Sequence, residues 1–273
     1  MMMQHIVSTM HRKDASFVEE MQCKCPVLVV NQAEGTGDVS TNMGSLSVRM
    51  ITNSERGLSN SRNCLLDHAE GDICIVGDDD LLYAPGYVEI IGNAYRNYPK
   101  ADIIVFRFSE RLDADTRRIF AEPRRLGMLQ ISKVASVEVT FRLDSIRRAG
   151  LRFDTLLGLG AKFGSGEENA FLADALRAGL RIQYVPATIC YCIEDQEDRR
   201  KWVDGFNEDY FVKKGACFYR IFGWLFLPMS AAFILLKKRS LFKNVPLFSA
   251  LRWMLAGKRE YRRMKKESLC ASV

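Results

Sequence analysis

DICIVGDDDLLYAP, residues 72–85, joins an apolar strand to three consecutive aspartates, Asp78, Asp79 and Asp80. Three like charges at the end of an apolar strand are unfavourable unless a cation offsets them. Asp78 and Asp80 alternate along an extended chain and point to the same side, where a hard divalent ion and the phosphates it neutralises fit. The stretch therefore predicts a metal-assisted phosphate site, with an acidic turn and a helix-capping aspartate as the alternative interpretation.

Around this stretch, short β-rich runs alternate with helical stretches. We expect strands at residues 5–9, 27–31, 48–52, 72–76 and 102–108, and helices at 14–21, 59–68 and 87–98. This alternation is typical of an α/β fold with a Rossmann-like, mainly parallel sheet flanked by helices. Because such sheets bind ligands at the carboxyl ends of their strands, we expect Thr9, Asn31, Asn53 and Asp78 to share one pocket at one edge.

The second half of the chain continues with weaker signals. Residues 34–46 are rich in Gly, Ser and Thr and predict a loop, and residues 114–128 have mixed charges without a clear period. A helix is expected at 167–179, with Glu167 and Glu168 in its first turn and Gly179 as its stop. Residues 181–192 predict a strand pair or one long strand broken at Pro186, and the charged segment 194–201 ends the core domain.

Upstream of the aspartates, ITNSERGLSNSRNCLLDHAEGD (51–72) places Arg56 and Arg62 around a glycine turn and a helix start, which suits a nucleotide diphosphate. Its core ERGLSNSRN (55–63), followed by the acidic strand end, resembles the family-two glycosyltransferases of the GT-A fold. HIVSTMHRKD (5–14) and GSGEENAFLADALRAG (164–179) extend the resemblance, which covers roughly residues 4–191 with three motifs in order.

The resemblance implies inverting transfer, in which an acceptor hydroxyl attacks the anomeric carbon of a nucleotide-sugar and the nucleotide diphosphate leaves. Asp78, Asp79 and Asp80 would hold Mg²⁺ or Mn²⁺ and the diphosphate, assisted by Arg62, and Thr9 would line the nucleotide pocket. Glu168 is the expected base, with Glu167 as the other candidate, because adjacent like charges raise one pKa. Without the motif context, the two glutamates read as favourable acids at a helix N-terminus.

One position departs from the pattern of the family, which commonly carries an acidic pair after the second strand to recognise the base. This chain has Asn31 and Gln32 there, and the nearest acids are Glu34 and Asp38. The two amides either bind a uracil edge, being both donors and acceptors, or are loop residues after a strand. We expect a UDP-sugar as the donor, with base specificity open.

The bulk composition sets the broad class of protein. A chain of 273 residues with 48% hydrophobic and 26% charged residues allows one large α/β domain with an appendage and excludes general disorder. The eight cysteines are expected to be reduced cytosolic thiols, because no secretory signal is expected and the Cys23–Cys25 and Cys190–Cys192 spacings are too short for zinc. The three histidines are scattered, with surface or structural roles by default.

The C-terminal region predicts a membrane-associating tail. Residues 221–236 are continuously apolar, and a strongly basic segment follows, from Lys237 to Lys266 with Glu260 as its only acid. The apolar run is short for a span and contains Pro228, so an interfacial helix or helical pair is preferred over a transmembrane span or a buried core helix. We therefore predict a catalytic domain at 1–200, a membrane-associating region at 201–273, an anionic membrane as partner and no nucleic acid.

Four aromatic residues follow the core domain and allow two interpretations. Trp202, Phe206, Tyr210 and Phe211 either form a shelf over the acceptor or pack the tail onto the domain. The expected acceptor is lipid-linked or a growing polysaccharide at the cytoplasmic face of a bacterial membrane. Two rivals stay open, namely a nucleotidyltransferase or phosphotransferase on a similar sheet, and a non-catalytic membrane adaptor that keeps the fold.

Overall fold

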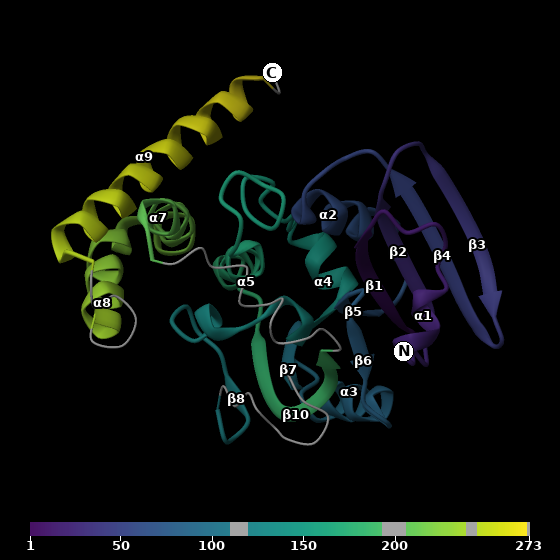
Figure 1. Cartoon of the computed structure of the whole chain (residues 1–273). Helices are drawn as coiled ribbons and strands as arrows, with labels where there is room; N and C mark the ends of the chain where they lie inside the picture. Colours follow the sequence, from purple (N-terminus) through teal and green to yellow (C-terminus); the bar gives the residue numbers. More distant parts are fainter. Residues whose placement is uncertain (110–119, 193–205, 239–244, 272–273) are drawn as a thin grey trace.

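A computed structural model describes residues 1–109, 120–192, 206–238 and 245–271 of the chain. Its centre is a ten-stranded sheet in the order β3-β4-β2-β1-β5-β9-β7-β10-β6, with β8 paired to β10 (Figure 1). The strands are β1 Met3–Met10, β2 Val27–Gln32, β3 Gly37–Met43, β4 Leu46–Asn53, β5 Ile73–Asp78, β6 Leu81–Tyr83, β7 Ile103–Ser109, β8 Arg124–Arg125, β9 Val139–Arg142 and β10 Ile182–Cys192.

Six strands of this sheet run in one direction. Strands β4, β2, β1 and β5 pair in parallel, and so do β7 and β10. Between β5 and β7 lies β9, antiparallel to both. The prediction of a mainly parallel α/β sheet is confirmed, and the five predicted strands begin and end within two residues of β1, β2, β4, β5 and β7.

The predicted loop at residues 34–46 is wrong. Residues Gly37–Met43 form β3, which pairs antiparallel with β4 through a two-residue turn at Gly44 and Ser45. Nearly every β3 side chain is exposed, so the strand has no apolar alternation to reveal it in the sequence. An edge strand of this kind forms through its backbone bonds, and here an ion pair from Arg49 to Asp38 supports it.

Helices cover both faces of the sheet. They are α1 Phe17–Glu20, α2 Leu58–His68, α3 Tyr87–Asn97, α4 Leu143–Arg148 and α5 Glu167–Arg177. The helix predicted at 14–21 is too long, because the backbone N–H of Ser16 donates to the Asp14 carboxylate in a local turn and Gln22 has φ +56°. The helix of Glu167 ends before Gly179, which has φ +82° as a C-terminal glycine requires.

The structure describes only some of the segments predicted for the second half of the chain. Residues Ile182–Cys192 form a single strand, in which the register with β7 shifts between Tyr184 and Thr188, around Pro186. The bend that proline imposes is therefore absorbed as an irregularity and does not split the strand. The charged segment 194–201 lies outside the described residues, as do the first residues of the 114–128 stretch.

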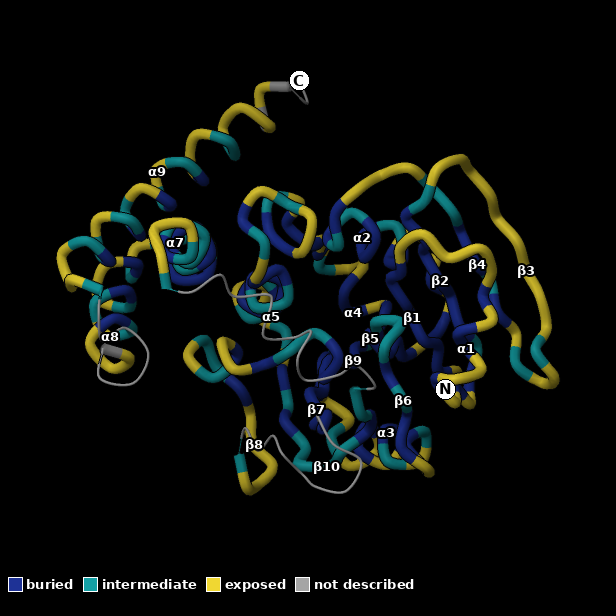
Figure 2. The backbone as a smooth tube through the Cα atoms, in the orientation of Figure 1, coloured by how far each residue is buried: buried dark blue, intermediate teal, exposed yellow. Residues whose placement is uncertain are grey.

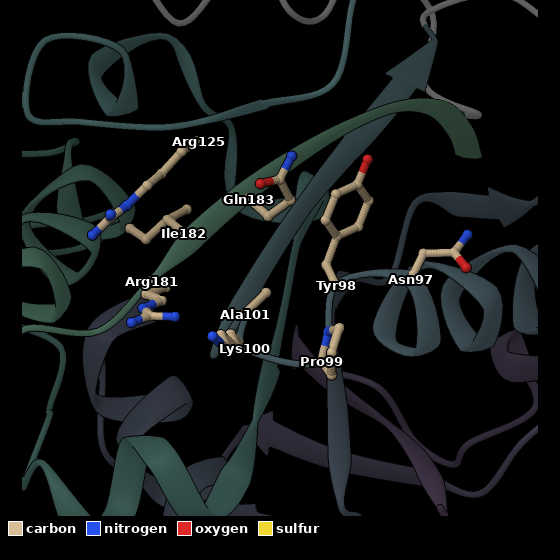
Figure 3. A pocket seen from close by; sticks show the side chains of 9 residues that line it. All are labelled: Asn97, Tyr98, Pro99, Lys100, Ala101, Arg125, Arg181, Ile182 and Gln183. Atoms are coloured by element: carbon tan, nitrogen blue, oxygen red, sulfur yellow. The ribbon is translucent and has the colours of Figure 1, made fainter.

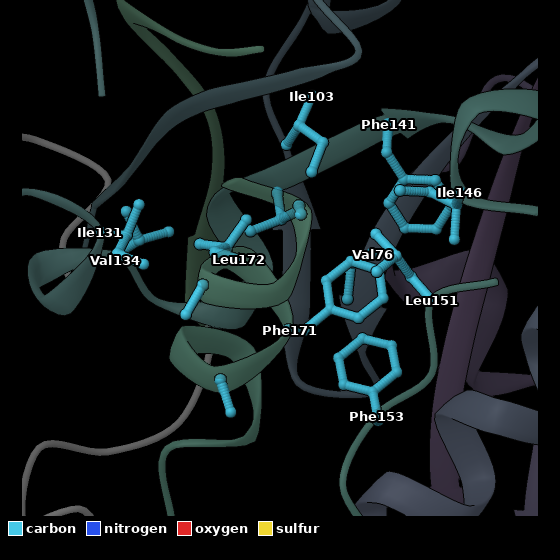
Figure 4. Packing of buried hydrophobic residues seen from close by; sticks show 14 of the residues in the cluster. Val76, Ile103, Ile131, Val134, Phe141, Ile146, Leu151, Phe153, Phe171 and Leu172 are labelled. Atoms are coloured by element: carbon cyan, nitrogen blue, oxygen red, sulfur yellow. The ribbon is translucent and has the colours of Figure 1, made fainter. Parts of the chain in front are cut away.

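Two apolar cores lie on opposite faces of the sheet, so its central strands are buried throughout (Figure 2). The core under α2, α4 and α5 contains a stack of Phe153 on Phe171, with ring centroids 4.3 Å apart (Figure 4). Since Phe171 lies on α5, this packing fixes the helix of Glu167 and Glu168 against the sheet.

The C-terminal region contains α7 Glu208–Phe222, the 3₁₀ turn η3 Gly223–Leu225, α8 Phe226–Lys238 and α9 Leu247–Ala271. Within the described residues, Glu208–Lys237 is one helical stretch long and apolar enough to cross a membrane by length and composition alone. The stretch is not straight, however, because Gly223 at φ +55° breaks it and α8 leaves the direction of α7 (Figure 1). Pro228 lies in the first turn of α8, where no helical N–H is lost, so the break falls at Gly223 and not at the proline.

Candidate active site

A cavity of about 350 Å³ opens at the carboxyl ends of β1, β2 and β5. Its walls combine the ends of these strands, the start of α2 and the loop that precedes α5. The lining residues are Ser8, Thr9, Met10, Gln32, Arg56, Gly57, Leu58, Asp78, Asp79, Asp80, Leu159 and Gly160. The parallel register brings Thr9 beside Asn31 and Ser8 beside Asp78. Thr9 and Asp78 line the cavity as expected, whereas Asn31 and Asn53 are not among its lining residues.

All three aspartates of the triplet line this cavity, and each has a different partner. Asp79 accepts from the Thr9 hydroxyl at 2.6 Å and from Arg12 Nε at 2.9 Å. Asp78 accepts from Arg62 Nη2 at 3.2 Å, and Asp80 accepts from the Cys192 thiol at 3.1 Å. The three carboxylates are thus held by separate groups around one hollow.

Arg62 is the only residue of α2 that reaches both acidic motifs. Its side chain is 1% exposed, and its Nη1 donates to Glu167 Oε1 at 2.8 Å while Nη2 reaches Asp78. The guanidinium also lies over the Phe153 ring, 5.6 Å from its centroid. One buried cation therefore ties the end of β5 to the start of α5, and the two predicted acidic motifs meet in space.

The two glutamates of α5 occupy different electrostatic positions. Glu167 is buried and paired with Arg62, whereas desolvation and the neighbouring Glu167 charge raise the pKa of Glu168 to about 8. Desolvation also raises the pKa of Asp78, an effect that Arg62 opposes and that Asp80 and Glu167 reinforce. A carboxyl with a pKa near neutrality is suited to proton transfer. Neither glutamate is among the residues that line the cavity.

The acidic triplet fits a divalent cation only with help from other ligands. Within the described parts of the chain, no three His, Cys, Asp or Glu side chains are grouped closely enough to form a metal site by themselves. The oxygen chemistry nevertheless suits Mg²⁺ or Mn²⁺, because the carboxylates of Asp78, Asp79 and Asp80 all line one hollow. Such ions commonly complete their coordination with water and phosphate oxygens.

Asn31 and Gln32 lie at the end of β2, and both amides are engaged. The Asn31 side chain accepts from the backbone N–H of Arg12 and donates to the Arg12 carbonyl. Gln32 accepts from the Gly57 N–H at 2.9 Å and donates to the Gly57 carbonyl at 3.3 Å. Gln32 therefore lines the cavity, whereas Asn31 is not among its lining residues, and direct contact of either with a nucleobase stays a prediction.

The wall formed by residues 157–160 was not predicted from the sequence. Leu58 N–H donates to the Leu159 carbonyl, and Ser59 donates to the Leu157 carbonyl. A Cβ placed on Gly160, which has φ +76°, would lie 3.3 Å from Gly57 Cα. The run of glycines at 158, 160, 164 and 166 was the signal that could have identified this loop. Cys192, the partner of Asp80, was also missed.

The remaining predicted groups lie away from the cavity. Phe211 is fully buried and packs near Trp253, and Phe206 and Tyr210 pack against the same cluster, so these three aromatics hold the tail together. Trp202 lies outside the described residues. His5 is buried and hydrogen-bonded to Tyr87 beneath the sheet, a structural role.

A second hollow of about 440 Å³ lies at the opposite end of the sheet, beside the first residues of β7 and β10. Figure 3 shows Arg125 and Arg181 on one side of it and Tyr98 on the other. Among the described residues that line it, none belongs to the acidic motifs. The candidate chemistry is therefore concentrated at the carboxyl ends of the strands.

Comparison with known proteins identifies a matching family and a shared fold. Residues 19–147 match the family described as glycosyl transferase family 2. No curated protein sequence matches the chain significantly. Among solved structures, TarS 1-349 of S. aureus in complex with UDP-GlcNAc is 14% identical with a TM-score of 0.62, over 100% of this chain and 92% of that chain. The mannosyltransferase PcManGT of Pyrobaculum calidifontis, in complex with GDP-Man and Mn²⁺, is 15% identical with a TM-score of 0.50, over 94% and 86%.

Proposed function

Because this chain is a glycosyltransferase of family two with the GT-A fold, we propose that it moves a sugar from a UDP-sugar to a lipid-linked or polysaccharide acceptor, with inversion. The observation that carries the proposal is the Arg62 bridge, which joins the acidic end of β5 to the acidic start of α5. The proposed metal ligand Asp78 and the helix that carries the proposed base Glu168 are thereby held close together. UDP is the first choice of nucleotide because the TarS neighbour was solved with UDP-GlcNAc.

In the proposed reaction, Glu168 removes the proton of the acceptor hydroxyl as that oxygen attacks the anomeric carbon. The bond to the nucleotide diphosphate breaks on the opposite face, so the configuration inverts and the diphosphate departs with the electron pair. Arg62 pairs with Glu167, and Glu168, with its raised pKa, is the group that exchanges a proton in this proposal.

Asp78, Asp79 and Asp80 would hold Mg²⁺ or Mn²⁺ at the cavity, and the ion would supply positive charge for the departing diphosphate. Thr9 and Arg12 hold Asp79 in place from β1 and the turn after it. Asn31 and Gln32 support the donor pocket and are proposed to approach the base. The Mn²⁺ complex of the mannosyltransferase neighbour is consistent with this cofactor.

We place the enzyme at the cytoplasmic face of a membrane, with residues 1–200 as the catalytic unit and 201–273 as the associating region. The apolar α8 and the basic α9 support this placement. The boundary itself falls outside the described residues. Ile221, Phe222 and Tyr261 join the core of the catalytic unit, so the two regions pack as neighbours.

Product analysis with a labelled UDP-sugar, Mn²⁺ and candidate acceptors tests the reaction. Free UDP together with labelled acceptor is the expected result. Release of pyrophosphate would support a nucleotidyltransferase instead. Absence of metal-dependent UDP binding by calorimetry would support a non-catalytic adaptor.

Two variants test the assignment of roles. Asp80→Ala is expected to abolish metal-dependent donor binding, because its carboxylate lines the cavity. Glu168→Gln should leave donor binding intact and lower turnover by roughly 100-fold or more, since only proton removal is lost. Equal loss of donor binding in both variants would contradict the separation into a metal-holding and a proton-removing group.

A further inference from the structure

The outward face of α8 is apolar along its whole length. Leu227, Pro228, Ala232, Leu235 and Leu236 are exposed and recur at helical spacing on one side. The opposite side, with Phe226, Ser230 and Ile234, is buried against the other C-terminal helices. A helix facing water normally carries polar residues outward, and a helix that is apolar all round belongs in a core or a membrane.

Two large apolar side chains outside α8 are also exposed. Trp224 in η3 is 89% exposed, and Phe248 at the start of α9 is 79% exposed. Single exposed apolar residues are ordinary, but large ones gathered in one short segment mark an interaction site. We call the outward face of α8 together with Trp224 and Phe248 the α8 surface.

The next helix, α9, carries exposed positive charges. The exposed cations are Arg252, Arg259, Arg262, Arg263 and Lys266. Of the two acids on that helix, Glu260 pairs with Lys162 and Glu267 lies 4.0 Å from Arg263. An apolar patch followed by unbalanced positive charge is complementary to an anionic lipid surface, whereas a second copy of this chain would bring like charges together.

The length of α8 excludes a span and favours an interfacial position. Thirteen residues extend about 20 Å at 1.5 Å per residue, well short of the roughly 30 Å hydrocarbon layer. The preceding α7 cannot supply the missing length, because Phe211, Ala216 and Ile221 are buried in the protein.

A buried ionic network holds α7 and α9 against the catalytic unit. Arg220 of α7 donates to Asp154 at 2.7 Å and also pairs with Asp174 of α5. Tyr261 of α9 donates to the same Asp154 carboxylate, whose side chain is 1% exposed. Glycines bring the two helices together, since a Cβ on Gly257 would clash with the Val212 backbone. The helices of the tail are therefore fixed relative to α5, the helix of Glu168.

We propose that the α8 surface inserts into the headgroup region of an anionic bilayer while the basic face of α9 binds the lipid charges. The inference deepens the proposed function by naming the membrane-contacting residues. The inference rests on the proposed function in one respect, namely that the acceptor is located at a membrane. Membrane binding itself requires neither donor nor metal.

The test is flotation of the full chain with vesicles of phosphatidylcholine and phosphatidylglycerol. Leu235→Ser combined with Leu236→Ser should weaken vesicle binding about tenfold or more, because both side chains are exposed and apolar. Val39→Ser is the matched control, since Val39 and Leu235 are each 62% exposed and Val39 lies on the distant β3. Vesicle binding by the double variant equal to wild type would overturn the proposal.

Two further measurements separate the alternatives. Brominated lipids should quench the fluorescence of the wild type more than that of Trp224→Phe, whereas Trp253→Phe should keep most of the quenching. A lipid-free dimer that the double variant converts to a monomer would overturn the proposal in favour of self-association. Metal-dependent UDP binding is measured on the same samples. Absence of UDP binding by the wild type would contradict the proposed function, whereas absence of vesicle binding by the wild type in the flotation assay would contradict only the membrane proposal.

Discussion

Arg62 and Glu167 form a buried ion pair, 2.8 Å between Nη1 and Oε1, across 105 residues of sequence. The pair joins α2 to the first turn of α5, the helix that carries Glu168. The second nitrogen of the same guanidinium reaches Asp78, so one cation compensates two carboxylates.

Removing this cation should destabilise the protein strongly. Arg62→Ala leaves Glu167 and Asp78 without their counter-charge in a desolvated place, and we expect a loss of about 3–5 kcal/mol in the free energy of unfolding. Urea denaturation measures it. The control is Arg152→Ala, which breaks the exposed pair with Asp67 and should cost no more than about 1 kcal/mol. Similar losses in the two variants would show that the Arg62 pair is effectively solvated.

The rate should depend on pH through Glu168. A base acts only when deprotonated, and the pKa of Glu168 is raised to about 8 by desolvation and by Glu167. The turnover number is therefore expected to increase as pH rises through about 8. Glu167→Gln removes a like charge, so the rising limb should move to lower pH. A rate profile that is flat from pH 6 to 9 in wild type would rule out Glu168 as the titrating base.

The contact between Gly160 and Gly57 should control donor binding. Gly160→Ala adds a methyl group 3.3 Å from Gly57 Cα at a residue with φ +76°, which displaces the cavity wall. Gly150→Ala is the matched control, because Gly150 has φ +61° with no atom within 4 Å of the added carbon. Both variants should lose about 1 kcal/mol of stability from backbone strain, whereas only Gly160→Ala should weaken UDP binding in calorimetry. Equal UDP affinity of the Gly160→Ala and Gly150→Ala variants would show that the loop at residues 157–160 is not part of the donor site.

Gln32 should affect donor binding by supporting the cavity wall at Gly57, and not by recognising the nucleobase of the donor. Both ends of its amide are hydrogen-bonded to the Gly57 backbone, the oxygen to the N–H and the nitrogen to the carbonyl. We expect Gln32→Ala to raise the Michaelis constants of UDP-sugars and GDP-sugars by similar factors, because the start of α2 loses its support. Steady-state kinetics with both donor classes measure this. A loss confined to uridine donors would instead show that Gln32 reads the base.

Much of the fold was predictable because its signals are local. Apolar runs in the sequence indicate the strands β1, β2, β4, β5 and β7. Glycines at the helix ends indicate α3 and α5. The exposed β3 carries no such pattern, and Asp14 forms a turn where a helix was expected. The break between α7 and α8 depends on Gly223, whereas the prediction from the sequence considered only Pro228 in this region.

By itself, the sequence determined the α/β alternation, the acidic end of β5 and the acidic start of α5, because strand alternation, helix periodicity and consecutive charges all act over a few residues. Only the tertiary structure decided that Arg62 joins Asp78 to Glu167, that Gln32 holds Gly57, and that an apolar face of α8 points outward. These relationships depend on which surfaces pack together across long stretches of chain, and burial and charge pairing exist only once that packing is complete.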